Sequence, residues 1–290
     1  MRFHCRMRIV LGVALGLAAA GVQAQMFVDA VQYPAWLERR GLEVPLRPGI
    51  ALEAADRVRT GEGARVQMRL SEGSTVKLGE RAQFVVERVE DRGVLKAALS
   101  VIAGAFRFTS QAARQAAGRE VSVKVKSVTI GIRGTDVWGK SSAERDLACL
   151  LEGRITVGSE GNPTVTLEQP LDFYEKPTGA APRVARVDQK QVDEWAKETE
   201  PQDDGPVSRG GGKWTVVAGK YTVRDGARAA VRDLRARGYP AELAGGERDE
   251  PYRAQIRGLA GEAQARALMS NLRDMPGLGI PFVTDLDLGR

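Results

Sequence analysis

The stretch VSVKVK at residues 121–126 alternates apolar and polar side chains at every step. Because successive side chains of a strand point to opposite faces of a sheet, this period of two predicts a strand with one buried face. RVQMRL at 65–70 and TVKL at 75–78 repeat the pattern around the turn residues SEGS at 71–74. Short strands at roughly 8–12-residue spacing predict a mainly β module over residues 25–187, built as a sandwich, a barrel or a short solenoid.

The pattern changes after residue 213. A short β-run at 214–218 is followed by helical spacing over 225–238, with Gly238 where a helix-terminating glycine belongs. Strand patterns at 239–244 and 252–257, a helical pattern at 262–273 and a last strand at 280–284 complete the region. The order β-α-β-β-α-β predicts a small α+β domain over 213–290, a four-stranded antiparallel sheet with two helices on one face.

Residues 188–212 separate the two regions. Asp188 is the expected N-cap of a short helix that ends at Lys197. The segment 198–212 holds two prolines, four acidic residues and four glycines, and Val207 is its one aliphatic side chain. Such a composition buries little apolar area, so we expect a flexible linker. The segment 111–118, rich in Ala and Gln, is expected to be a loop or one helical turn between strands.

The first residues are typical of an export signal. Three arginines precede an uncharged apolar run at 9–20, and VQA at 22–24 supplies small residues for cleavage after Ala24. We therefore predict a signal peptide over 1–24 and a periplasmic or other extracytoplasmic location. A retained anchor would need about 20 apolar residues, and a buried N-terminal helix leaves the arginines unexplained. No later stretch reaches spanning length, so no stable membrane span is expected.

The charge balance argues against a nucleic-acid partner. The chain has 43 Lys and Arg against 37 Asp and Glu, and the predicted signal holds three of the arginines and no acid. The mature chain is thus left with 40 basic against 37 acidic side chains, a net charge of only +3. A nucleic-acid-binding domain normally carries a clustered basic excess, which is missing here.

The residue inventory favours a protein that is not an enzyme. The only histidine is His4, inside the predicted signal, so the mature chain has none for Ser-His-Asp or Cys-His catalysis or for a zinc site. Cys149 lies in an apolar run and is expected to be a buried thiol. We expect no cofactor and no metal. A wall hydrolase that uses two carboxylates remains the enzymatic alternative, although no acid pair stands out by its spacing.

The β-rich region resembles the FecR family. The resemblance rests on WLER at 36–39, PLRPG at 45–49, DRVRT at 56–60, GARV at 63–66, LSEGS at 70–74, IGIRGTD at 130–136 and EGRITV at 152–157. It implies an extracytoplasmic β-rich module that serves as an interaction domain for an envelope protein or a polysaccharide. Founding members are membrane-spanning anti-sigma regulators with a cytoplasmic tail. We expect only the domain to carry over, because the mature sequence shows no span.

Residues 213–290 resemble the SPOR domain. WTVVAGKY at 214–221 matches the aromatic-led first strand of that family, and YRAQI at 252–256 matches its third strand. The family often has Gln where this chain has Val217, and Gly where it has Arg257. The resemblance implies binding to septal peptidoglycan, in particular to glycan strands stripped of their stem peptides, and hence a link to cell division.

Strand alternation sorts the side chains of this domain. Trp214, Val216 and Ala218 share the face expected to pack under the helices. The opposite, open face is then the candidate glycan site, formed by Thr215, Val217, Arg253, Gln255 and Arg257. Arg and Gln donate hydrogen bonds to sugar hydroxyls and N-acetyl carbonyls, and Arg pairs with a lactyl carboxylate. The alternative is an ordinary solvated sheet face.

The leading prediction is therefore a wall-binding adaptor. The alternative is a periplasmic sensing or signalling module that acts through a membrane partner. IGIRGTD lacks the Lys-Ser/Thr ending of a phosphate loop, so we expect a bulged turn in which Arg133 pairs with Asp136. The arginines at 228, 232 and 235 are expected on the solvated helix face, or to steer the domain toward anionic wall polymer.

Overall fold

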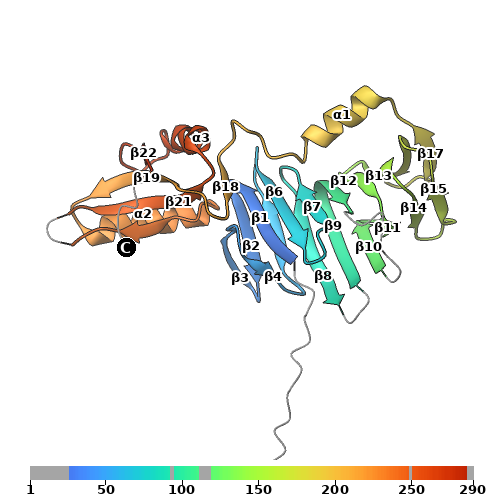
Figure 1. The fold of residues 1–290 in the computed structure, drawn as a ribbon, viewed down its shortest axis with the longest axis horizontal. Helices are drawn as coiled ribbons and strands as arrows, with labels where there is room; N and C mark the ends of the chain where they lie inside the picture. The colour runs from blue at the N-terminus through green and yellow to red at the C-terminus, as the bar shows by residue number, and fades with distance from the viewer. Residues whose placement is uncertain (1–25, 92–94, 111–118, 248–249, 286–290) are drawn as a thin grey trace, which may run out of the picture.

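The computed structural model describes residues 26–91, 95–110, 119–247 and 250–285. It shows a β-rich module followed by a small α+β domain (Figure 1). This arrangement confirms the predicted fold class. The predicted signal peptide at 1–24 and the segment 111–118 lie outside the described residues.

The β-module is a sandwich of two sheets. The first contains β1 (Met26–Gln32), β4 (Ala51–Leu52), β6 (Arg65–Leu70), β7 (Thr75–Leu78), β12 (Asp136–Ser141), β13 (Arg145–Glu152), β16 (Asp172–Pro177) and β17 (Arg183–Arg186). The second contains β2 (Ala35–Arg39), β3 (Leu42–Pro45), β5 (Arg57–Thr60), β8 (Gln83–Asp91), β10 (Arg119–Val125), β11 (Val128–Ile132), β14 (Ile155–Ser159) and β15 (Val165–Leu167). The long strand β9 (Leu95–Thr109) belongs to both, since it pairs with β8 and β10 in the second sheet and with β7 and β12 in the first.

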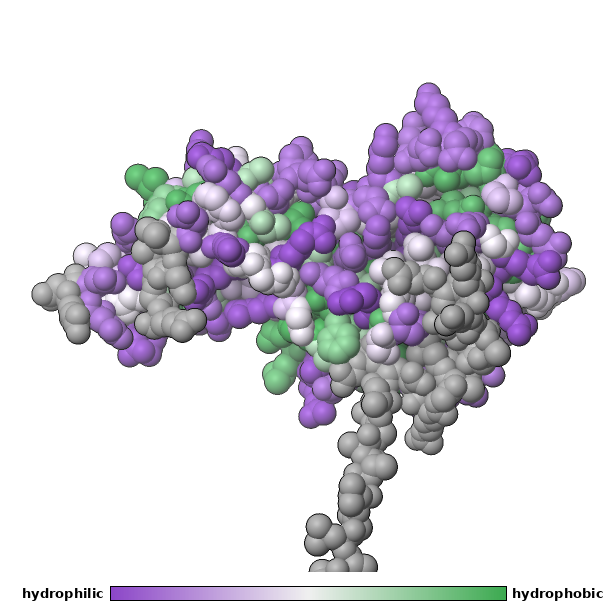
Figure 2. All heavy atoms as spheres, viewed as in Figure 1, coloured by the Kyte–Doolittle hydropathy of each residue, from purple (hydrophilic) through white to green (hydrophobic). Residues whose placement is uncertain are grey.

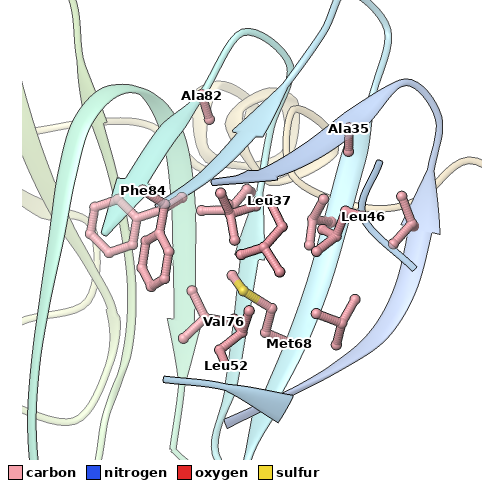
Figure 3. Close-up of a cluster of buried hydrophobic side chains, with 14 of the residues drawn as sticks. Ala35, Leu37, Leu46, Leu52, Met68, Val76, Ala82 and Phe84 are labelled. Carbon is pink, nitrogen blue, oxygen red and sulfur yellow. The ribbon is translucent and has the colours of Figure 1, made fainter. Parts of the chain in front are cut away.

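The core lies between these sheets. Leu37 and Phe84 of the second sheet meet Met68 and Val76 of the first, and all four are buried (Figure 3). Burying each such side chain contributes about 1.5–3 kcal/mol. In β10 the valines at 121, 123 and 125 are buried and Lys124 is exposed, which confirms the alternation in VSVKVK.

Helix α1 (Gln189–Lys197) lies against the outer face of the first sheet. Asp188 accepts a hydrogen bond from the backbone N–H of Gln191 at 2.8 Å, which confirms the predicted N-cap. The ring of Trp195 stacks on the buried ring of Trp138 with 4.7 Å between centroids. The helix therefore covers an apolar part of the sheet that alternation alone would leave in water.

The segment after α1 is anchored to the sheet instead of forming a linker without fixed contacts. Glu200 forms ion pairs with Lys77 at 2.5 Å and with Arg107 at 3.1 Å, and Glu198 pairs with Lys140 at 2.8 Å. Residues Val207–Arg209 then form β18, which runs antiparallel to β1. The linker prediction was wrong for these residues because their order comes from partners on the sheet, not from their own composition.

The C-terminal domain has the predicted order of elements. These are β19 (Trp214–Tyr221), α2 (Arg224–Ala236), β20 (Glu242–Ala244), β21 (Tyr252–Leu259), α3 (Glu262–Leu272) and β22 (Phe282–Thr284). The strands pair antiparallel in the order β20-β21-β19-β22. Both helices pack on one face, where α2 buries the side chains of Ala227, Ala230, Val231 and Leu234.

The two modules are joined by backbone and side-chain contacts. Ser208 of β18 pairs with Leu259 of β21, so β18 connects the first sheet of the β-module to the C-terminal sheet. At the carboxyl end of α2, the indole N–H of Trp36 donates to the carbonyl of Ala236 at 3.2 Å, and the guanidinium of Arg47 donates to that of Pro240 at 3.3 Å. Helix ends leave carbonyls without partners in the helix, and Trp36 supplies a donor to one of them, while Arg47 binds the chain just beyond the helix.

The surface carries apolar side chains only in small separate groups in the view of Figure 2. Scattered apolar residues of this kind are normal on a protein in water. Within the described ranges, no helix combines the length and apolarity needed to cross a membrane.

Candidate functional site

The strand register defines the two faces of the C-terminal sheet. Glu242 lies opposite Gln255, Gln255 opposite Val217, and Val217 opposite Phe282, so these four side chains form one row across the sheet. On the other face Val216 lies opposite both Ile256 and Val283 and packs in the core with the helices. The predicted division into a helix-covered face and an opposite face is confirmed.

The predicted exposure of the candidate residues is largely wrong. Four of the five are buried, with relative exposures of 0% for Val217, 2% for Gln255, 4% for Thr215 and 7% for Arg253. Arg257 alone is exposed. Alternation fixes the direction of a side chain but not its accessibility. Val217, for example, lies between the larger side chains of Gln255 and Phe282 on the two neighbouring strands.

Hydrogen bonds link several of these side chains across the open face. The amide of Gln255 donates to Glu242 at 3.2 Å, and Arg253 donates to Glu250 at 3.3 Å. Arg257 lies 3.7 Å from Glu242. The carboxylate of Glu242 therefore joins a buried amide to an exposed guanidinium at the edge of this face.

Two accessible residues of this face escaped the sequence analysis. Lys220 is exposed, and its ammonium lies 4.8 Å from the centroid of the half-buried Phe282 ring. A bulge between Val217 and Gly219 shifts the alternation and turns Lys220 onto the open face. Strict alternation would place Lys220 on the helix-covered face. The one sequence signal for the bulge is Gly219, because a glycine inside a strand often marks a bulge.

The β-module has a separate groove on the outer face of its second sheet. It encloses about 1260 Å³, and Ser122, Gly131 and Thr156 lie side by side across adjacent strands along it. Arginines 88, 133 and 154 and Lys96 also line the groove, together with Glu87 and Glu120. The groove thus combines small side chains in its centre with a cationic majority among its charged groups.

The stretch IGIRGTD contributes to this groove through Arg133, but not in the predicted pairing. Asp136 accepts hydrogen bonds from Arg107 at 2.7 and 2.9 Å, because β12 lies beside β9. The Arg133–Asp136 pair was therefore a wrong prediction. A bulge between Asp136 and Val137 does occur, at the place where the turn was expected.

Reactive groups are few in the described ranges. Cys149 is fully buried, and its burial raises the pKa of the thiol to about 12, so the thiolate is disfavoured. No group of three or more His, Cys, Asp or Glu side chains with metal-binding geometry occurs in the part of the chain that the structure describes.

Comparisons with known proteins divide the chain in the same way. Residues 56–156 match the family described as FecR protein, and residues 210–279 match the SPOR domain. No curated protein matches the sequence. Two crystal structures of a candidate anti-sigma factor from Parabacteroides distasonis are similar at 12% identity, with TM-scores of 0.42 and 0.43. Each match covers 76% of this chain, and the matches cover 92% and 91% of the two solved chains.

The two family matches cover separate parts of the chain and define a modular protein. More particularly, it carries a FecR domain followed by a C-terminal SPOR domain. These are non-catalytic binding domains, and no enzyme family is among the matches. A SPOR domain implies peptidoglycan binding, and SPOR domains are periplasmic or extracytoplasmic.

Proposed function

We propose that this chain is an exported envelope protein that binds peptide-free peptidoglycan glycan through the open face of its SPOR domain. The SPOR match over residues 210–279, together with the helix-backed four-stranded sheet, carries this proposal. Its export depends on the predicted signal at residues 1–24. At the division site, where stem peptides are removed, the protein would be concentrated on the wall.

The open face offers suitable chemistry for a sugar polymer. Arg257 and Lys220 are exposed hydrogen-bond donors, and the Phe282 ring is a partly exposed apolar surface beside them. Thr215, Val217, Arg253 and Gln255 form the floor that supports these groups. A neutral hydrogen bond contributes only about 1 kcal/mol net, so useful affinity requires contact with several sugars at once.

Sedimentation with purified sacculi tests the proposal. The full chain should pellet with amidase-treated sacculi and much less with untreated sacculi. The double variant Lys220→Ala/Arg257→Ala should lose most of this binding. The matched control Lys190→Ala/Lys197→Ala removes the same charge from exposed positions of α1 and should bind normally. Equal pelleting with treated and untreated sacculi would remove the claim for peptide-free glycan.

The FecR domain is proposed to be an interaction module for an envelope protein or a polysaccharide, with the groove around Ser122 and Gly131 as the contact surface. Three of the four cations are ion-paired, Lys96 with Glu120, Arg88 with Glu90 and Arg154 with Glu168, so the cationic excess that favours an anionic partner is small. Gly131→Lys would place a long side chain in the groove and displace the Thr156 hydroxyl, which would lie 2.5 Å from the added Cβ. In cells that carry this variant, the crosslinked products that depend on the FecR domain should disappear.

The alternative is a sensing module that signals through a membrane partner. It would use the same FecR groove, so the identity of the crosslinked protein separates the two functions. Recovery of an integral inner-membrane protein whose capture depends on the groove supports sensing. Recovery of wall material or periplasmic proteins alone supports the adaptor.

A further inference from the structure

A pocket of about 290 Å³ opens where the SPOR sheet meets the β-module. Glu242 and Arg257 line it from the SPOR sheet, Arg209 from the end of β18, and Tyr33 and Arg47 from the β-module. Arg257 and Glu242 also belong to the open face described above. The pocket therefore continues the candidate glycan face across the boundary between the domains.

The charges of this pocket suit an anion. Arg47, Arg209 and Arg257 contribute to its lining, together with one carboxylate, that of Glu242. Arg is the side chain best matched to a carboxylate, because its planar fork presents parallel N–H donors. The volume lies near the lower end of the roughly 300–1,000 Å³ found for ligand sites. It suits one acidic sugar unit better than a long segment of polymer.

Contacts of Arg47 and of the backbone at Arg209 fix the segments that carry the arginines from outside the SPOR sheet. Arg47 donates to the carbonyl of Pro240 across the domain boundary at 3.3 Å. Arg209 lies opposite Ala30 in the β1–β18 ladder. The loop that follows it packs closely on β21, since a Cβ at Gly212 would lie 2.3 Å from the carbonyl oxygen of Gly258. The backbone on this side of the pocket is thus fixed by contacts within the chain.

A path for a longer polymer leads away from the pocket. Arg209 also lines a second open hollow of about 450 Å³, together with Asp29, Gln67 and Arg69 on β1 and β6. Asp29 and Arg69 are paired at 3.1 Å. Polar side chains therefore continue from the SPOR sheet onto the outer face of the β-module.

We propose that the junction pocket is the carboxylate subsite of the glycan site. Arg47 and Arg209, both outside the matched SPOR sheet, act with Arg257 to bind the lactyl carboxylate of a peptide-free muramic acid unit. The neighbouring sugars continue onto β1 and β6. This inference rests on the proposed function. It explains why peptide removal matters, because an amide-linked lactyl group has no negative charge to pair with the arginines.

The test uses the full chain and amidase-treated sacculi, before and after the free carboxylates are converted to methylamides with carbodiimide and methylamine. Arg209→Ala removes an exposed side chain and leaves the β18 backbone ladder in place, and it should weaken binding about tenfold. Arg47→Ala should do the same, with its unfolding midpoint measured to confirm that the domains stay docked. Lys190→Ala, at an exposed position of α1, is the charge-matched control.

The outcomes separate the inference from the proposed function. Methylamidation should weaken the wild-type chain about as much as Arg209→Ala does, and should have little further effect on that variant. If the arginine variants bind as well as the wild type, and methylamidation of the sacculi does not weaken wild-type binding, the carboxylate subsite is overturned and the SPOR proposal is left intact. Failure of the wild-type chain to bind treated sacculi at all would overturn both.

Discussion

Replacing Gly238 with alanine should loosen the contact between the two domains. Gly238 has a φ of 82°, in the left-handed region that costs an alanine roughly 1 kcal/mol. An added Cβ would also lie 2.7 and 2.8 Å from two carbons of the Trp36 ring. Relieving such overpacking typically costs about 1–3 kcal/mol. We therefore expect Gly238→Ala to destabilise the chain by about 2–4 kcal/mol.

Two further variants separate these contributions. Gly211 has nearly the same φ, 79°, but nothing within 4 Å of an added Cβ, so Gly211→Ala should cost only the conformational share of about 1 kcal/mol. In a chain that already carries Trp36→Leu, the free-energy cost of Gly238→Ala should likewise fall to about 1 kcal/mol. The coupling energy between the two positions is then about 1–3 kcal/mol.

Urea unfolding of the full chain, followed by far-ultraviolet circular dichroism, supplies these free energies. The decisive comparison is between the two glycine variants. If Gly238→Ala costs no more than Gly211→Ala, or if its cost is unchanged when the Trp36 ring is removed, then the end of α2 does not rest on that ring and the domain contact is misassigned.

Three other predictions follow from local contacts. Asp188→Ala removes the N-cap of α1 and should cost about 1 kcal/mol, seen as a lower urea midpoint, whereas Asp193→Ala in the same helix should cost less. Cys149 should resist a thiol reagent at pH 8 and react fully in denaturant, because burial raises its pKa to about 12; fast labelling of Cys149 itself in the folded chain, distinguished from Cys5 by peptide mapping, would contradict this burial. Burial alone would raise the pKa of Glu175, but hydrogen bonds from Arg145 and Arg183 outweigh it and lower that pKa. The wild-type chain should therefore be more stable than Glu175→Gln at every pH above about 4.3, and this difference should disappear as the pH falls through the lowered pKa that Glu175 has in the folded chain. A difference that persists in acid would refute this role.

The sequence predicted the elements whose order depends on their own side chains. The alternation in VSVKVK and the apolar spacing of α2 are local patterns, and each element needs only a core to pack against. The parallel pairing of β10 with β9 was not predicted, because register between strands joined by a long connection depends on contacts that no local pattern encodes.

The errors have a common physical origin. Residues 198–209 are too polar to bury themselves, but Lys77, Arg107 and Lys140 supply charges that hold Glu198 and Glu200 on the sheet. The exposure of the candidate glycan residues was misjudged for a similar reason. Val217 faces the expected side, yet side chains on neighbouring strands decide whether water reaches it. Both are properties of the assembled sheet and not of the segment.

The strand β18 gives the binding proposal its structural basis. It is hydrogen-bonded to β1 on one side and meets β21 on the other, so the SPOR sheet is held against the β-module and not tethered by a free chain. Contacts with successive sugars add less affinity if the protein segments that make them must first become ordered, because ordering side chains and loops costs free energy on binding. Docked domains avoid that cost for a polymer that touches both. The junction arginines can therefore add to the affinity of the SPOR face only as long as β18 and the contact between Trp36 and α2 remain in place.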